Sequence, residues 1–440
     1  MRGSEGSPEA FWRGLRDSPI LKDHPLQEKD WATCIPLGLH GDGGAFSKQD
    51  SLFVLSWNSL CAGAASEGFA RRFIFTIVRK RVMTTETMDA LWKIFSWSMN
   101  NLFTGITPST DWEGRPREGG AQYVAQGWQG ALVQIRGDWE FYANVLGVPN
   151  WASALNMCWF CKASNSTPHL LWTLFGLDAG WRPTRRTHNS WIEELTAEGK
   201  EQPLLFKLVI GLTLPCLMVD VLHAVDQGVA SHVIGNIFLA VIGRRAAGTM
   251  ESRAMALGEE LENWCKAHKV KSRIQGKLTI ARLRNQSGFP KLKAKAAATR
   301  HVSEFALHIA KAECGGDKRV VAVAQLMCRF YKELATAGMF LEQDVVDRVA
   351  KIGRQLCCIY ADMARESLAT GVRMWKLAPK FHLFQHLCEW QIAETPLNPR
   401  TYWTYADEDL VGQMVEVSAS CHVSTLPAVA LSKWVLLALD

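Results

Sequence analysis

The sequence predicts an α/β fold in which a sheet-forming part is interrupted by a long, mainly helical region. Between residues 31 and 147, short apolar or alternating segments separated by glycine, serine and aspartate are typical of strands. From about 200 to 375, apolar residues recur every three or four positions, which is the pattern of amphipathic helices. The last section returns to mixed character. We therefore expect one sheet, assembled early in the chain and closed by its last segment.

Three strands are expected in a row near the beginning. Their segments read ATCIPLGLH, DSLFVLSWNSL and RRFIFTIVRKRV, and their close spacing favours an antiparallel meander. A helix is expected over residues 84–103, with Thr85 as its N-cap and apolar residues at helical spacing. A fourth strand should begin at residue 130 and end at Gly137, before a turn at Asp138 into another helix.

Length and composition indicate a globular protein of two to three domains. The chain has 440 residues, 48% of them hydrophobic, and a formal net charge of +6. Twelve cysteines without an apolar N-terminal signal segment favour a reducing, intracellular compartment with free thiols. The most apolar window, 204–225, contains charged residues and a proline, so we expect it inside the protein and not in a membrane. The expected divisions are a leader that docks or stays loose (1–30), a first part of the core (31–200), a mainly helical insertion (201–375) and a closing part of the core (376–440).

Two acids stand where the first and fourth strands are expected to end. Asp42 lies in GLHGDGGAFS and Asp138 lies in VQIRGDWEF. A carboxylate fixed by a strand and flanked by glycine allows a phosphate or a metal to approach closely. Each acid also has a structural alternative, because Asp-Gly is a hairpin-turn signal and Asp138 is suited to cap a helix. Two carboxylates brought together by adjacent strands would repel each other unless Mg²⁺ or Mn²⁺ joined them.

With these acids in this order, the sequence resembles the ribonuclease H-like catalytic core of DDE transposases, especially the hAT, Kyakuja-Dileera-Zisupton and Plavaka-like groups. The resemblance implies a ribonuclease H-like mixed sheet flanked by helices and interrupted by an all-helical insertion. It also implies a final glutamate at the start of a late helix. Glu408 in TYADEDLVGQMVEV is the choice for that position, with Asp407, Asp409 and Glu416 left open. The alternative is that these acids only favour the helix N-terminus through its dipole.

The resemblance implies that Asp42, Asp138 and Glu408 bind two Mg²⁺ or Mn²⁺ ions and cleave DNA. Water would attack a phosphodiester, and the freed 3′ hydroxyl would attack a target strand. We therefore expect DNA as partner, no membrane, a nuclear or cytoplasmic location, and leave homo-oligomerisation open. The alternative is a non-catalytic nucleic-acid-binding or scaffold protein derived from a transposase, because no DNA-binding signature precedes Asp42. A hydrolase of small phosphorylated substrates is more remote, and P-loop, GxSxG and HExxH motifs are absent from the sequence.

Two further motifs are expected to support the site. The resemblance includes a Cys-or-Asp, two residues, His element, which Asp220 and His223 match in MVDVLHAVDQG, with Asp226 one step further. On a helix these three would share a face, where they could orient active-site residues or contact nucleic acid. The alternative is a partly buried histidine satisfied by a neighbouring acid. His382 and His386 in PKFHLFQH form an i, i+4 pair, for which we expect a structural role or a place in the active-site wall.

A pair of cysteines has the spacing of half a zinc site. Cys158 and Cys161 in CWFC are separated by two residues, as in a zinc knuckle. His169, His188 or Cys216 could complete a structural Zn²⁺ site, and free core thiols are the alternative.

The positive charge is concentrated in one segment of the helical region, 263–303. No acid occurs between Glu262 and Glu304, whereas eleven cations do. Such a segment fits contact with a phosphate backbone, and the alternative is a solvated helix face. The predicted nucleic-acid-binding residues are Lys266, Lys269, Lys271, Arg273, Lys277, Arg282, Arg284, Lys291, Lys293, Lys295 and Arg300.

Overall fold

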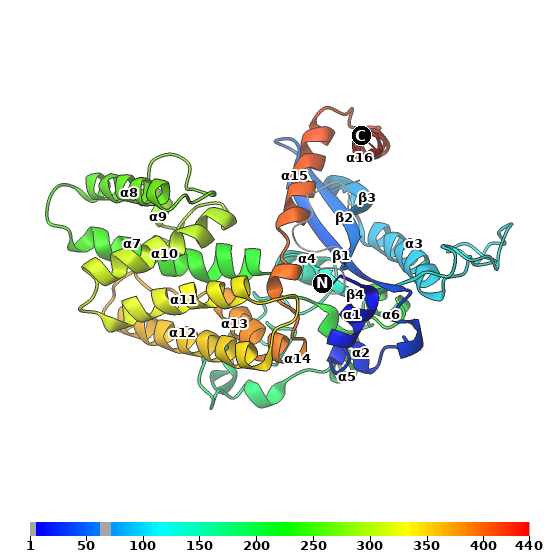
Figure 1. The fold of residues 1–440 in the computed structure, drawn as a ribbon, viewed down its shortest axis with the longest axis horizontal. Coiled ribbons are helices and arrows are strands. Elements are labelled where there is room, and N and C mark those ends of the chain that lie inside the picture. Colours follow the sequence, from blue (N-terminus) through cyan, green and yellow to red (C-terminus); the bar gives the residue numbers. More distant parts are fainter. Residues whose placement is uncertain (1–5, 62–71, 440) are drawn as a thin grey trace.

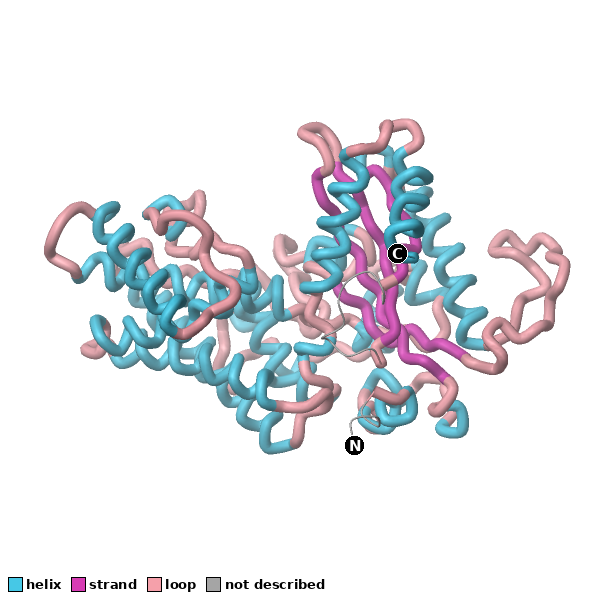
Figure 2. Tube along the Cα trace, turned by 45° about the horizontal axis from the view of Figure 1, so that its top comes forward, coloured by secondary structure: helices cyan, strands magenta, loops and turns pink. Residues whose placement is uncertain are grey.

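The computed structural model describes residues 6–61 and 72–439 and consists of two parts that lie side by side (Figure 1). One part is built on a β-sheet and holds both ends of the described chain. The other part is a stack of long helices. Figure 2 shows the strands gathered in the first part and the longest helices in the second. The predicted α/β class is confirmed.

The sheet has four strands in the order β3-β2-β1-β4. Strand β1 (Cys34–Ala45) pairs antiparallel with β2 (Ser51–Ser59), and β2 pairs antiparallel with β3 (Phe73–Arg79). Strand β4 (Gln129–Arg136) returns parallel to β1 on its other side. The sheet is therefore mixed, and β1 is its central strand between β2 and β4.

Alternating side chains of the strands supply two hydrophobic faces. On β2, Phe53 and Leu55 belong to the main core, whereas Leu52 and Val54 belong to a smaller second core. This alternation is the period-2 pattern of a strand buried on both sides. Each face must therefore be covered by helices.

Helices on the two faces come from opposite ends of the sequence. Helix α3 (Thr85–Thr104) packs beside β4, and its N-cap is Thr84, one residue earlier than expected. Helices α15 (Tyr405–Ala419) and α16 (Leu426–Leu439) cover the second face. The end of the chain thus packs against the strands with which it begins.

The helical part carries one very apolar helix in its interior. The continuous stretch Leu222–Arg244 is long and apolar enough to span a membrane, but 89% of its most apolar window is buried inside the protein. It begins as a π-helix, η7 (Leu222–Ala230), and continues as α7 (Ser231–Arg244). The helices around it are α8 (Met250–Ala267), α9 (Ile280–Leu283), α10 (Ala296–Glu313), α11 (Lys318–Thr336), α12 (Gln343–Ala369) and α13 (Pro379–His386).

Short helices connect the two parts and cover the N-terminal edge. In the leader, Trp12 is buried and its indole nitrogen donates a hydrogen bond to the carbonyl of Cys34 at 2.7 Å, so the described leader docks on β1. The remaining helices are α1 (Pro8–Gly14), α2 (Pro19–Lys22), α4 (Trp139–Asn144), α5 (His188–Ala197), α6 (Leu204–Leu208), the π-helix η8 (Leu387–Gln391) and α14 (Ile392–Glu394).

Candidate metal centre and carboxylate site

Four metal-ligating side chains converge in the interior. The ligand atoms of Cys158, Cys161, His382 and His386 all lie within 4.8 Å of one another, and all four residues are buried. The Cys161 sulfur is 3.4 Å from each of the two histidine Nε2 atoms, which are 2.8 Å apart. Cysteine and histidine arrive from segments 221 residues apart in the sequence. This cluster could bind a metal such as zinc.

The surroundings hold the cysteine loop in place. The Arg186 guanidinium donates hydrogen bonds to the carbonyl oxygens of Cys158 and Cys161 and pairs with Glu194 at 2.8 Å. The Trp181 ring meets the edges of both histidine rings. These contacts with protein groups hold the cysteine loop and helix α13 in position, as the outer contacts of a structural metal site do.

The protonation of Cys158 and His386 suits a metal that takes thiolate and neutral imidazole, whereas burial and the neighbouring Cys158 raise the pKa of Cys161 well above its usual range. Burial by itself would raise the pKa of the Cys158 thiol, but hydrogen bonds from Cys161 and the histidines lower it well below its usual range. Burial lowers the pKa of His386 to about 4, so this imidazole is neutral. The His382 Nδ1 atom is buried without a hydrogen-bond partner in the described chain. Two sulfurs and two nitrogens form the tetrahedral donor set that zinc prefers.

The ligand set differs from the one expected from the sequence. The cysteine pair was expected to be completed by His169, His188 or Cys216, and none of these joins the cluster in the described chain. His382 and His386, for which a structural role or a place in the active-site wall was expected, stand beside the cysteines. The missed signal was their i, i+4 spacing, which places both imidazoles on one side of α13.

Asp42 lies within strand β1 and not in a turn. It pairs in register with Val54 of β2, and the hairpin turn falls later, at 46–50. The hairpin-turn alternative is therefore wrong. The glycine before it has a packing reason, because a Cβ at Gly41 would lie 2.3 Å from the Phe141 ring.

Asp138 lies two residues after the end of β4, with Gly137 between them. The parallel register of β1 and β4 ends with the pair His40 and Arg136, so Asp42 and Asp138 each lie two positions beyond the last pair. One oxygen of Asp138 accepts a hydrogen bond from the Phe141 amide at 2.7 Å, which makes it the N-cap of α4. The helix-capping alternative is thus observed, and it uses one of the two carboxylate oxygens.

Glu408 on α15 faces Asp42. Burial raises the pKa of Glu408, and the Asp42 charge and hydrogen bond raise it further, to about 8, against a lowering effect of His223. Its Oε1 atom lies 3.4 Å from Nε2 of His223, yet it is buried and has no hydrogen-bond partner in the described chain. Asp409 and Glu416, the outer alternatives, are exposed. Among the four candidates for the third acid, and within the described residues, only Glu408 contacts Asp42 and has a buried oxygen without a hydrogen-bond partner.

The neighbouring Asp407 has a different role. It is fully buried and forms ion pairs with Arg72 at 2.8 Å and Arg136 at 3.3 Å. Burial would raise the pKa of Asp407, but the charges of Arg136, His40 and Arg72 lower it to about 2. Asp407 therefore joins α15 to β4 and the segment before β3 by compensated charge.

Asp220 and His223 form the expected pair behind Glu408. Nδ1 of His223 lies 2.7 Å from the Asp220 carboxylate, which also accepts hydrogen bonds from the amide and hydroxyl of Thr404. Burial lowers the pKa of His223, but the hydrogen bond and charge of Asp220 outweigh it and raise the pKa to about 8. Asp220 thereby links the start of the π-helix to the start of α15.

Asp226 does not share this face. Its carboxylate accepts hydrogen bonds from the hydroxyls of Tyr331 on α11 and Tyr405 on α15. The segment is a π-helix, whose wider turns separate side chains that an α-helix would align. Asp220 lies just before the helix, so the expected three-residue helix face does not form, although Asp220 and His223 contact each other.

Lys380 is a cation near the acids that the sequence interpretation missed. Its side chain crosses the π-helix at Gly228, where a Cβ would lie 2.8 Å from Lys380 Cδ. Burial and the charge of Lys291 lower the pKa of Lys380 to about 8, whereas Asp138 and Asp220 act in the opposite direction. No ion pair of Lys380 occurs among the described residues. The only signal was its place in PKFH, next to His382.

The predicted basic segment does not form one surface. Lys266 pairs with Glu262 at 2.7 Å, and the Lys293 ammonium donates to a backbone carbonyl. Burial lowers the pKa of the half-buried Lys291. Only Lys269, Lys271 and Arg300 line a common groove with cations from other elements.

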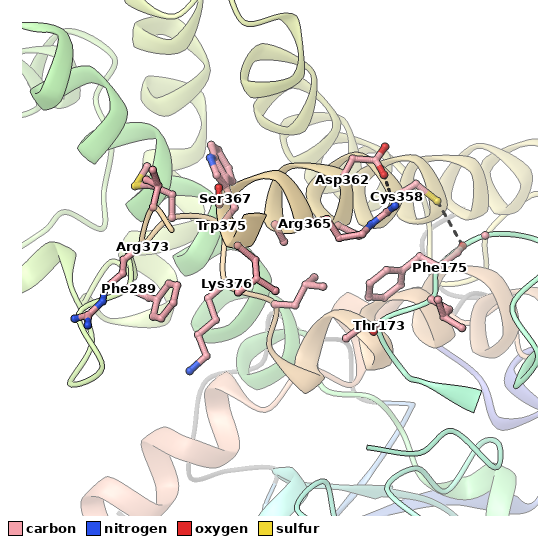
Figure 3. A pocket seen from close by; sticks show the side chains of 18 of the residues that line it. Thr173, Phe175, Phe289, Cys358, Asp362, Arg365, Ser367, Arg373, Trp375 and Lys376 are labelled. Atoms are coloured by element: carbon pink, nitrogen blue, oxygen red, sulfur yellow. Dashed lines mark hydrogen bonds and ion pairs between the residues drawn. The ribbon is translucent and has the colours of Figure 1, made fainter. Parts of the chain in front are cut away.

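A separate apolar cavity of about 860 Å³ lies at the C-terminal half of α12 (Figure 3). Phe175 and Trp375 line it, and the Cys358 thiol donates to the carbonyl of Phe175 at 3.5 Å. Its acid Asp362 pairs with Arg365. The cavity contains neither the Cys/His cluster nor the acids that face Asp42, so the site chemistry lies elsewhere.

No protein-family model matches this chain, and no curated protein matches it significantly. The functional argument therefore depends on the geometry of the two sites.

Proposed function

We propose that this protein is a metal-dependent polynucleotidyl transferase or nuclease with a ribonuclease H-like core of the DDE transposase type. The observation that carries the proposal is the meeting of Asp42 from β1 with Glu408 from α15, where one buried glutamate oxygen lacks a partner. Asp138, which follows the strand parallel to β1, supplies the third carboxylate. Hard oxygen donors of this kind suit Mg²⁺ or Mn²⁺.

The order of the strands supports this proposal. The resemblance implies a first acid on the first strand of an antiparallel meander and a second acid after a fourth strand. Here β1, β2 and β3 form the meander, and β4 lies parallel to β1. Helix α15 then brings the third acid back onto β1 from the other end of the chain.

Asp42, Asp138 and Glu408 would hold the ions, which would activate the attacking water or hydroxyl and stabilise the leaving oxygen. The chain's own groups prepare the site. Asp220 holds His223 so that its Nε2 faces Glu408, which orients the glutamate. Lys380 adds a cation close to Asp138, where it would offset the negative charge of a bound phosphate.

We also propose that the Cys/His cluster holds a structural Zn²⁺ ion. Its ligands connect the loop after α4 with helix α13, so they join segments on either side of the helical insertion. Helix α13 also carries Lys380. A closed metal site here would fix the position of that lysine relative to Asp138.

The direct test is nicking of supercoiled plasmid DNA with added magnesium or manganese. We expect the wild type to nick and the Asp42→Asn and Glu408→Gln variants to fall to background. Asp409→Asn is the matched control, because Asp409 is an exposed acid on the same helix. Equal cleavage by the wild type and Asp42→Ala would refute the assignment.

One observation favours the non-catalytic alternative. The ligand oxygens of Asp42, Asp138 and Glu408 do not converge within 4.8 Å of one another as the Cys/His cluster does in the described chain, and Asp138 already caps α4. A nucleic-acid-binding or scaffold protein would bind DNA in a salt-sensitive manner without cutting it. It would keep this binding after Asp138→Ala.

A further inference from the structure

A basic groove lies between helices α10 and α11 and the segments 268–271 and 400–403. Its volume is about 1010 Å³, and Glu304 is the only acid in its lining. Four of its cations lie outside the basic segment that the sequence suggested. The cations that line it are Lys269, Lys271, Arg300, Lys311, Arg329, Lys332 and Arg400.

These cations lack carboxylate partners in the described chain, unlike other arginines of the same helical part. Arg245 pairs with Glu260 at 2.8 Å and Glu313 at 2.6 Å, and Arg319 pairs with Glu366 at 2.6 Å. No such ion pair occurs for a groove cation among the residues described. Uncompensated positive charge is therefore a local property of the groove, and it favours a polyanionic ligand.

Arg300 stands at the end of the groove nearest the acids. Its guanidinium carbon lies 4.5 Å from the centre of the Trp403 ring and 4.9 Å from that of Tyr405, and its Nη1 atom is buried without a hydrogen-bond partner in the described chain. Arg400 lies over the same tryptophan at 5.1 Å. Two guanidiniums against one ring repel each other, so an anion between them would relieve the repulsion.

Arg300 connects the groove to the helix that carries Glu408. Its guanidinium lies over Tyr405, which is one helical turn before Glu408 on α15. Trp264 and His268 also line the groove and stack with ring centres 4.1 Å apart. Cations that follow a backbone, combined with aromatic side chains, are the usual means of binding single strands.

We propose that the basic groove binds the phosphodiester backbone of a single DNA strand that continues to the Asp42 and Glu408 site. The direction of the strand rests on the proposed function, whereas binding to the groove does not. The volume of about 1010 Å³ is in the range of sites that hold a ligand the size of a short single-strand segment. The phosphates would pair with Arg300, Arg329 and the surrounding lysines.

The test is fluorescence anisotropy with a labelled oligothymidylate of about 16 nucleotides. It is run without added divalent ions and without a chelator, since a chelator would strip the Cys/His cluster. The groove variant combines Lys311→Ala, Arg329→Ala and Lys332→Ala, all exposed positions on α10 and α11. The matched control removes the same charge at three exposed helical lysines outside the groove: Lys93→Ala, Lys318→Ala and Lys351→Ala.

We expect the groove variant to bind at least about tenfold more weakly than the control. The slope of log affinity against log salt concentration should also become shallower by about two, because each of the three lost phosphate contacts removes about 0.7 from it. Equal affinity of the two triple variants would overturn the proposal. So would tighter binding by the wild type to a duplex of the same length or to anionic lipid vesicles. Failure of plasmid nicking leaves this result unaffected, so the two proposals fail separately.

Discussion

The two candidate metal sites of this protein differ in every property that separates a structural from a catalytic site. The Cys/His cluster is buried, has four converging ligands and lies inside a shell of tryptophan and arginine contacts. The acids around Asp42 are hard ligands, converge less closely, and leave one oxygen of Glu408 unsatisfied. Structural zinc sites are closed by four protein ligands, whereas catalytic sites keep open positions for water and substrate. These differences are consistent with the proposal of a structural metal at the Cys/His cluster and a catalytic role for the acids around Asp42.

Helix α13 connects the two sites. It presents His382 and His386 to the cysteines, and Lys380 extends from the start of the same helix towards Asp138 and Asp220. Lys380, His382 and His386 all lie on this eight-residue helix, so a shift of the histidines would move the lysine as well. The closed site is therefore expected to support the geometry of the open one.

The largest expected effect is loss of the structural metal. Cys161→Ser should reduce bound zinc from about one ion per chain to near zero and destabilise the fold strongly, because zinc contributes about 10 kcal/mol or more in small zinc domains. Elemental analysis of the purified protein and thermal unfolding measure the two quantities. Cys216→Ser is the matched control, since Cys216 is equally buried and lies outside the cluster. Equal zinc content and equal unfolding temperature for both variants would contradict the assignment.

The next effect separates two adjacent acids on α15. Asp407→Asn leaves the buried guanidiniums of Arg72 and Arg136 without their charged partner, so we expect a loss of about 3–5 kcal/mol in unfolding free energy. Glu408→Gln should change stability less, because the only ion-pair partner of Glu408 in the described chain is His223, at the longer distance of 3.4 Å. Urea unfolding of both variants measures the difference. A similar loss for the two variants would mean that Glu408 is also a structural acid.

The fold class and most elements were predictable because the patterns behind them are local. Alternation and helical spacing depend on neighbouring residues, and they indicated all four strands and the long helices of the second part. Strand β1 continues past its expected end, through Asp42 to Ala45, because β2 supplies backbone partners for the glycine-rich stretch. A glycine-rich sequence alone does not reveal such a partner.

The sites were less predictable because long-range packing decides them. Asp407 and Glu408 are adjacent acids in the sequence, and the positions of Arg72 and Arg136 make the first a structural acid. The four residues of the Cys/His cluster occur in the sequence as two separate pairs, of which only the cysteines were expected to bind zinc, and 221 residues separate Cys161 from His382. The cations of segment 263–303 could be recognised in the sequence, but the groove also includes Arg329 from helix α11. The sequence therefore indicates which residue types are present, whereas the tertiary fold determines which of these residues lie together.

A smaller effect concerns catalysis at the open site. Lys380→Met keeps most of the side-chain volume but removes the cation near Asp138, so we expect DNA cleavage to slow by about 100-fold, or about 2.7 kcal/mol. The loss should appear in kcat more than in KM, and Lys380→Arg should restore part of it. Lys376→Met is the control, because Lys376 is exposed and lies over Phe289. An equal loss with Lys376→Met, or a loss confined to KM, would argue against a role at the reacting phosphate.

The smallest effect is a pH dependence at the boundary between the two parts of the molecule. Burial raises the pKa of Asp226 to about 7, although hydrogen bonds from Tyr331 and Tyr405 and the charge of Arg300 act against the rise. A carboxyl whose folded-state pKa lies above its ordinary value stabilises the fold at low pH and loses this contribution as pH rises through 7. Between about pH 4 and 7, stability should fall by up to about 1.4 kcal/mol per pH unit from this group.

Asp226→Asn removes that dependence because the amide stays uncharged at every pH. Urea unfolding at several pH values should therefore show the variant gaining on the wild type from about pH 4 to about pH 7, with a constant difference above. Asp362→Asn is the control, since Asp362 is an exposed acid that pairs only at the surface with Arg365. Parallel curves for the wild type and Asp226→Asn would show that Asp226 is ionised in the folded protein. In that case the carboxylate that joins α11 to α15 would be charged. Asp226 would then resemble Asp407, whose charge is balanced by arginines, more than Glu408, which has an oxygen without a hydrogen-bond partner in the described chain.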